Sequence, residues 1–141
     1  MAESIQQLFA RREVAGRSFF AGDPGPIFAM WSRADDVTIF GGSGSAARGW
    51  AAVKPRLEYG AAMFKGGQGS VEPVAMGESG DLAYMVCVER GETGSAGSDG
   101  SRPVALRITE IFRREDGEWK MIHRHADAIV DRPPLRATDS L

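Results

Sequence analysis

The amino-acid sequence predicts an α+β fold in which helices come first and an antiparallel sheet follows. Apolar residues recur at helical spacing in the first half of the chain and alternate with polar residues in the second half. Short turns containing glycine join most of the alternating segments. Helices followed by consecutive strands with short connections are typical of α+β domains rather than of repeated βαβ units. We therefore expect one sheet packed against N-terminal helices.

Three helices are expected in the first half of the chain. The first spans residues 4–21, where apolar side chains follow helical spacing and Ser4 can cap the N-terminus. Prolines and glycines in 22–26 end this helix because neither residue continues helical backbone well. A short apolar stripe over 27–31 predicts a second helix, and the run over 50–64 predicts a third.

Five strands are expected, one before the third helix and four after it. Their predicted ranges are 37–40, 69–76, 81–90, 103–114 and 118–130. The connection 91–101 is rich in glycine and serine, which predicts a mobile hairpin loop.

The chain is the size of one compact domain. It has 141 residues and a mass of 15.2 kDa, and area scaling predicts that about two-thirds of its surface is buried on folding. We expect the domain to span 1–132. Residues 133–141 begin with two prolines and are expected to form an extended or disordered tail.

Charge and composition exclude several classes of function. The 17 basic and 19 acidic side chains nearly cancel, which leaves no basic patch for nucleic acid or for an anionic membrane. No apolar run approaches the length of a membrane span, and charges interrupt the N-terminus where a signal peptide would be apolar. The single cysteine, Cys87, has no intramolecular partner. We expect a cytoplasmic protein that binds neither nucleic acid nor membrane.

Alternation within the strands separates core-facing from outward-facing residues. The even-numbered face of 103–114 is apolar except for one carboxylate, Glu110. On 81–90 the even-numbered residues are also expected to face the core: Leu82, Tyr84, Val86 and Val88. The strand 118–130 carries apolar bulk on both faces, so both need cover. Helices can cover one face, and we expect a homodimer to cover the other, which carries Trp119, His123 and His125.

Glu110 is the sharpest candidate for chemistry. A carboxylate among apolar neighbours either has a raised pKa or lies beside a cation. Its neighbour on the last strand depends on the turn that joins the two strands. A two-residue loop, Asp116-Gly117, places Glu110 opposite His123, whereas a three-residue turn places it diagonal to Arg124.

The end of the chain resembles a known family. The segment 113–127, RREDGEWKMIHRHAD, is similar to the last hairpin of the nuclear transport factor 2-like superfamily, and more narrowly to its SnoaL-like and calcium/calmodulin-kinase association-domain branch. The segments 21–24, 34–37 and 48–49 fit the same pattern, so the resemblance covers about residues 4–130. It implies a strongly curved antiparallel sheet wrapped around the N-terminal helices. The expected shape is a cone, an α+β barrel of cystatin-like topology, with an apolar cavity and a dimer formed through the outer face.

Ketosteroid isomerase has the same shape, and its catalytic positions can be compared one at a time. The position of its general base resembles Gly41, and the position of its helix tyrosine resembles Ala15, so both chemical groups are missing here. Its second oxyanion donor, a protonated acid, resembles Glu110. The kinase association domain has an arginine at that position. The resemblance therefore implies neither steroid isomerisation nor a preference for acidic ligands, and it favours the arrangement that pairs Glu110 with Arg124.

These residues lead to two hypotheses. In the first, the domain binds a small apolar ligand and isomerises, dehydrates or cyclises it. Glu110 would then act as acid, base or hydrogen-bond anchor, and Arg124 or His123 would set its charge. The expected lining residues are aromatic or aliphatic: Phe28, Trp31, Trp50, Phe64, Tyr84 and Ile108. In the second, the protein is a non-catalytic dimeric module for ligand sensing or assembly.

No metal or other cofactor is expected. His123, His125 and Asp127 project from one face of a predicted strand, but zinc normally needs three ligands of suitable geometry. The simpler interpretation is that both histidines pack beside Trp119 and Met121 on the face that meets the second copy.

Overall fold

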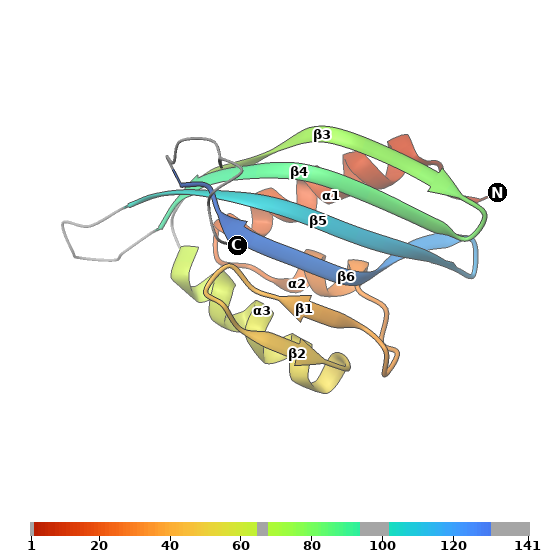
Figure 1. Ribbon diagram of the computed structural model, residues 1–141, viewed down its shortest axis with the longest axis horizontal. Helices are drawn as coiled ribbons and strands as arrows, with labels where there is room; N and C mark the ends of the chain where they lie inside the picture. Colours follow the sequence, from red (N-terminus) through yellow and green to blue (C-terminus); the bar gives the residue numbers. More distant parts are fainter. Residues whose placement is uncertain (1, 65–67, 94–101, 131–141) are drawn as a thin grey trace, which may run out of the picture.

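The computed structural model describes residues 2–64, 68–93 and 102–130, and its elements follow the predicted order (Figure 1). The helices are α1 (Ile5–Phe20), α2 (Gly25–Met30) and α3 (Trp50–Phe64). The strands are β1 (Thr38–Phe40), β2 (Ala46–Arg48), β3 (Gly69–Ser79), β4 (Leu82–Glu92), β5 (Pro103–Glu115) and β6 (Glu118–Ala128). The short strand β2 was not predicted. The tail and most of the predicted loop lie outside the described residues.

The strands form one sheet in the order β2-β1-β6-β5-β4-β3. Its long strands β3 to β6 curve over α1 and α2, and α3 lies beside β1 and β2 (Figure 1). The α+β prediction is confirmed, with two corrections. The sheet is not fully antiparallel, because β1 runs parallel to β6 with Thr38 opposite His123. It is also not a closed barrel, because β2 and β3 form its two edges.

Helix α1 shows why the sequence folds as it does at its N-terminus. Ser4 Oγ accepts a hydrogen bond from the Gln7 backbone N–H, and the Gln7 side-chain oxygen accepts one from the Ser4 backbone N–H, which completes a capping box. The buried residues of α1 form one stripe: Leu8, Arg12, Ala15, Gly16 and Phe20. One of them, Arg12, is charged. Among the described residues, no helix is both long and apolar enough to cross a membrane.

Strand β4 faces the core with the residues opposite to those expected. Its buried residues are odd-numbered: Ala83, Met85, Cys87 and Glu89. Met85 pairs with Glu110 across the ladder, so odd residues of β4 share a face with even residues of β5. Leu82 and Tyr84 are instead about half exposed on the outer face. The alternation of residues could not show which face of β4 points to the core, because both faces are largely apolar.

A tight turn and a bulge together set the register of β5 and β6. The turn is the two-residue loop, with φ of 51° at Asp116 and 79° at Gly117, as type I′ hairpins require. Ile111 then pairs with His123 but Phe112 pairs with Met121, so Ile122 is an extra residue on β6. The extra residue changes which side chains face inward along β6.

Because of the bulge, the residues expected on the dimer face do not all lie on one face of β6. Trp119 and Met121, before the bulge, are buried in the core, and so is Ala126, after it. His123 and His125 lie on the outer face, where they flank the ring of Phe40. Trp119 therefore does not share a face with the two histidines, as the simple period-two alternation had predicted.

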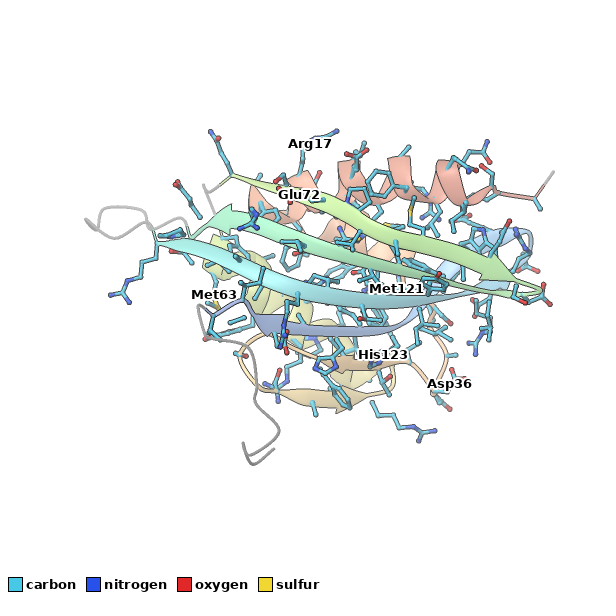
Figure 2. The ribbon with its side chains drawn as sticks, turned by 45° about the horizontal axis from the view of Figure 1, so that its top comes forward. Arg17, Asp36, Met63, Glu72, Met121 and His123 are labelled. Carbon is cyan, nitrogen blue, oxygen red and sulfur yellow. The ribbon has the colours of Figure 1, made fainter. Side chains whose placement is uncertain are left out.

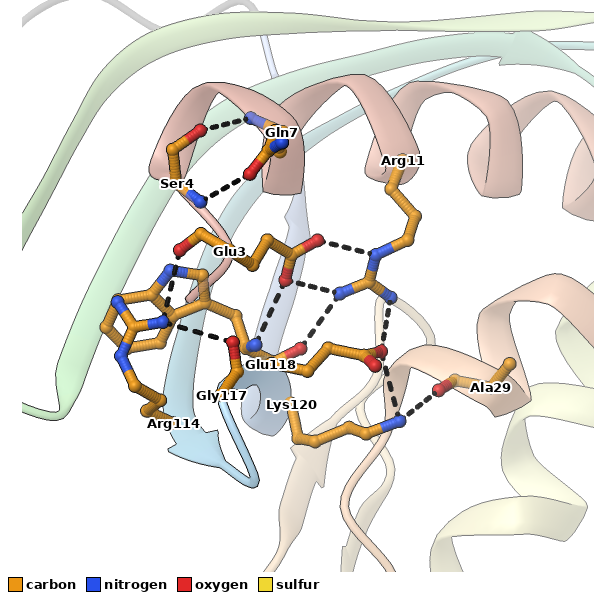
Figure 3. A network of polar contacts seen from close by, with 10 residues as sticks. Glu3, Ser4, Gln7, Arg11, Ala29, Arg114, Gly117, Glu118 and Lys120 are labelled. Carbon is orange, nitrogen blue, oxygen red and sulfur yellow. Dashed lines mark hydrogen bonds and ion pairs between the residues drawn. The ribbon is translucent and has the colours of Figure 1, made fainter. Parts of the chain in front are cut away.

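A polar network joins the N-terminal segment to the β5–β6 hairpin (Figure 3). Glu3 accepts two hydrogen bonds of 2.9 Å from Arg11 and one of 3.0 Å from the Trp119 backbone. Arg114 stacks on the Trp119 ring at 3.9 Å and donates to the Glu3 carbonyl. Lys120 donates to the Ala29 carbonyl at the end of α2. These contacts hold this end of the domain together.

Replacing Glu3 with alanine should lower the free energy of unfolding by about 1–2 kcal/mol, since three hydrogen bonds to one carboxylate are lost. Urea denaturation followed by circular dichroism measures the change. Glu58→Ala, at an exposed position of α3, is the control with the same change of charge. Equal stabilities of the two variants would contradict a role for the network.

Candidate functional site

Four charged side chains meet inside the domain. Arg12 comes from α1, Glu89 from β4, Glu110 from β5 and Arg124 from β6. Glu110 is fully buried, Arg12 and Glu89 are at most 4% exposed, and the Arg124 side chain is 14% exposed. We call these four residues the charge cluster. A cluster of this kind is costly to bury unless its charges are paired.

The pairing in the charge cluster is nearly complete. Arg12 donates to both oxygens of Glu110, at 2.8 and 3.1 Å, and also to Glu89. Arg124 Nη1 donates to Glu89 Oε1 at 2.9 Å and to Glu110 Oε2 at 2.8 Å, and Arg124 Nη2 donates to Glu89 Oε2 at 3.2 Å. All four carboxylate oxygens therefore accept hydrogen bonds from guanidinium groups, and two positive charges balance two negative ones.

The two arginines of the charge cluster lower the pKa of Glu89. Burial alone would raise the pKa of Glu89, but the charges of Arg124 and Arg12 outweigh it and lower that pKa to about 2. Burial acts against the charge of Arg12, yet Glu110 and Glu89 raise its pKa overall. Of the two environments expected for Glu110, the structure shows the one beside a cation. The carboxylates act as acceptors that hold the arginines.

A small cavity adjoins the charge cluster. Its lining combines the cluster with largely apolar residues of the helices and β6: Gly16, Phe19, Phe20, Ile27, Trp31, Leu57 and Met121. About 20 Å³ is open to the centre of a water molecule, which is room for about one water. The Trp31 side chain is buried, and its Nε1–H has no hydrogen-bond partner in the described part of the chain. We call this space the inner cavity.

Glycine at position 16 is needed beside the inner cavity. A Cβ atom there would lie 2.8 Å from Arg12 Nη1 and 3.2 Å from Val71 Cγ2. The absence of a side chain on α1 therefore leaves room for the Arg12 guanidinium, one turn earlier on the same helix face.

A larger pocket opens between α3 and the sheet. Its volume is about 320 Å³, and we call it the mouth pocket. Its lining is mostly apolar, with a few polar groups: Phe19, Ile39, Gly41, Gly42, Ser43, Ser45, Arg56, Leu57, Tyr59, Gly60, Met63, Phe64, Val104, Leu106 and Arg124. Phe19, Leu57 and Arg124 line both spaces. Figure 2 labels Met63, which lines the mouth pocket, and Met121, which lines the inner cavity. The two residues lie apart along the length of the sheet. Arg124 is thus the charged residue that the two spaces share.

Some predicted site residues meet at these cavities and others do not. Glu110 and Arg124 are directly opposite each other in the sheet, although the two-residue loop had been expected to pair Glu110 with His123. The bulge at Ile122 is the reason. Of the predicted lining residues, Trp31 lines the inner cavity and Phe64 lines the mouth pocket. The remaining four line neither space: Phe28, Trp50, Tyr84 and Ile108.

His123 lies outside the cavity. Its Nδ1 is 2.7 Å from Thr38 Oγ1, and burial together with the neighbouring His125 lowers its pKa. Asp127 forms an ion pair with Arg107 instead of turning toward the histidines. Within residues 2–64, 68–93 and 102–130, no three histidine, cysteine or acidic side chains are grouped as a metal site would require.

Sequence reasoning missed Arg12 and Glu89, half of the charge cluster. The burial of Arg12 could have been predicted, because Arg12 falls on the apolar stripe of α1 between Leu8 and Ala15. Glu89 was hidden by the wrong choice of face for β4. A charge at a core-facing position on each of two elements indicates a buried pair, provided that the faces are assigned correctly.

Curved-sheet domains with a cavity beneath the sheet form a broad class, and comparisons place this chain within it. The family model described as SnoaL-like domain matches residues 17–131. The chain therefore belongs to the SnoaL-like family, with an NTF2-like, cystatin-like fold. A search of curated proteins finds no match.

Solved structures show the same fold. A dehydratase candidate of the NTF2-like family from Streptomyces avermitilis superposes with a TM-score of 0.76 at 19% identity, covering 90% of this chain and 97% of that one. An NTF2-like protein of unknown function from Pseudomonas putida KT2440 has a TM-score of 0.66 at 26% identity, covering 92% and 94%. The CaMKII hub of S. rosetta has a TM-score of 0.66 at 18% identity, covering 86% and 94%.

Charge balance in the cluster can be tested with a paired substitution. Arg12→Met leaves two buried carboxylates with one arginine, so the free energy of unfolding should fall by about 3–5 kcal/mol. Adding Glu110→Gln restores the balance, because Arg124 and Glu89 keep their own two hydrogen bonds, and should recover part of the loss. Urea denaturation of Arg12→Met, of Glu110→Gln and of the double variant gives the three values. If the double variant loses as much as the two single losses added together, the charges are not coupled.

Proposed function

We propose that this domain binds a small, mainly apolar molecule in the mouth pocket, with the polar end of the molecule directed toward Arg124. The observation that supports this most is the position of Arg124, which lines both cavities. Apolar walls on α1, α3 and the sheet suit a hydrocarbon body, and one charged group at the inner end suits its orientation.

The geometry supports binding better than proton transfer. Both oxygens of Glu110 are engaged by Arg12 and Arg124, so Glu110 serves as the hydrogen-bond anchor that positions Arg124. A dehydration, isomerisation or cyclisation would then depend on orienting and polarising the ligand at Arg124. The structural similarity to a dehydratase candidate supports a role with a small molecule.

Filling the mouth pocket should abolish binding of a neutral fluorescent probe, N-phenyl-1-naphthylamine. Gly42→Phe places a ring against Leu106, since a Cβ at Gly42 would lie 3.1 Å from Leu106 Cδ2. We expect the wild type to raise probe fluorescence and the variant to bind it at least about tenfold more weakly.

The matched control is Gly25→Phe. Gly25 is also exposed, has no positive φ, and its Cβ would lie 3.1 Å from Asp23 Oδ1, but it lines neither space. It should bind like the wild type. Equal titrations for both variants, or no fluorescence change with the wild type, would reject the mouth pocket as a binding site.

A second proposal concerns the outer face of the sheet, which we propose forms a homodimer. Apolar side chains remain exposed or half-buried there, around a groove of about 410 Å³ lined in part by Val74, Val86 and Val88. Leu82 and Tyr84 extend the apolar surface along β4. Exposed apolar patches of this kind are typical of interaction surfaces. The similarity to a kinase hub supports self-association.

Light scattering after gel filtration should give a mass of about twice 15.2 kDa at micromolar concentration. Val86→Glu places a charge in the groove and should yield the monomer. Val14→Glu, at an exposed position of α1, is the control and should remain dimeric. A wild-type monomer would contradict the proposed homodimer.

A further inference from the structure

The inner cavity offers hydrogen-bond donors and few free acceptors. A guanidinium carries five N–H groups, and the contacts of Arg124 within the described residues use three of them. Two N–H groups of Arg124 therefore have no partner among the described residues. The Nε1–H of Trp31, which lines the inner cavity, is a further buried donor without a partner. The nearby carboxylate oxygens already accept from arginine.

The charge of the site is already balanced. Arg12 and Arg124 neutralise Glu89 and Glu110, so an anionic group brought into the inner cavity would find no uncompensated cation. It would lose its hydration without an equivalent return, and burying an unpaired charge is costly. A cationic group fails for the same reason and would also meet mainly donors.

We propose that the ligand carries an uncharged carbonyl group at its buried end, with the oxygen accepting from Trp31 Nε1–H, from Arg124, or from both. This inference rests on the proposed function, because it assumes that the body of the ligand occupies the mouth pocket. The inner cavity has room for about one water molecule, which is also the size of one carbonyl oxygen.

A carbonyl fits the site better than a hydroxyl. A hydroxyl group brings a proton that itself needs an acceptor, whereas a ketone, ester or amide oxygen is an acceptor only. In the described part of the site, six hydrogen bonds from Arg12 and Arg124 use most of the roughly eight lone-pair sites of Glu89 and Glu110, so few acceptor sites remain for a hydroxyl proton. A carbonyl oxygen would satisfy the unpartnered Trp31 without adding an unmet donor.

Three ligands of nearly equal shape separate the alternatives. Acetophenone carries a ketone, α-methylstyrene replaces its oxygen with a CH₂ group, and benzoate carries a negative charge. Isothermal titration of the wild-type protein should rank acetophenone about tenfold above α-methylstyrene, the value of one or two hydrogen bonds, with benzoate weaker than acetophenone. Tighter binding of benzoate, or equal binding of ketone and hydrocarbon, would overturn the inference while leaving the pocket intact. No binding of any of the three, together with failure of N-phenyl-1-naphthylamine to bind, would overturn the proposed function and this inference with it.

The chain supplies a matched pair of variants. Trp31→Phe removes the indole N–H of a residue that lines the inner cavity. Trp119→Phe removes the other indole N–H that is buried and unpartnered among the described residues, and Trp119 lines neither space. The preference for acetophenone over α-methylstyrene should fall by severalfold in Trp31→Phe and stay unchanged in Trp119→Phe. Because the readout is a ratio of two ligands in one protein, a general change in pocket size affects both. An unchanged ratio in Trp31→Phe would show that Trp31 does not hold the ligand.

A measurement on the wild-type protein is available if Trp31→Phe fails to fold. The infrared stretch of acetophenone labelled with ¹³C at the carbonyl moves to lower frequency when the oxygen accepts hydrogen bonds. We expect the bound ketone to absorb at lower frequency than the same ketone in hexane. A band at the hexane position would mean that the carbonyl lies in apolar surroundings, and it would overturn the inference.

Discussion

The charge cluster of Arg12, Glu89, Glu110 and Arg124 constrains the whole domain. Its four members come from one helix and three neighbouring strands, so α1, β4, β5 and β6 must all be in place before all four charges are paired. A shift by one residue in any of the strands would turn a carboxylate or guanidinium outward and leave its partners buried and unpaired. Shape and charge balance are therefore parts of one requirement.

The same cluster explains why the candidate site has the character of a binding site. The Glu110 carboxylate accepts hydrogen bonds from both arginines and so helps to hold the guanidinium groups in place. Arg124 is thus rigid, while the walls around it are apolar and the glycines at Gly41 and Gly42 leave space. In the proposed binding site, the donors that remain after internal pairing would select the ligand.

Much of this fold could be predicted from the sequence, because helical spacing, capping by Ser4 and punctuation by glycine and proline are local properties. What could not be predicted depends on partners far away in the chain. The face of β4 depends on its register with β5, and the inward turn of Arg124 depends on the extra residue Ile122 in β6. The parallel pairing of β1 with β6 has no local signal. The candidate site was half found for the same reason, since Glu110 stood out on its own strand whereas Glu89 did not.

The separation along the chain between the members of the cluster has a kinetic consequence. Arg12 and Glu110 are 98 residues apart, and Arg12 and Glu89 are 77 apart. Closing such long loops is slow and entropically costly, so local hairpins and helices form first and these ion pairs close late. Interactions absent from the folding transition state mainly govern the rate of unfolding. We therefore expect the ion pairs of Arg12 to slow unfolding more than they speed folding.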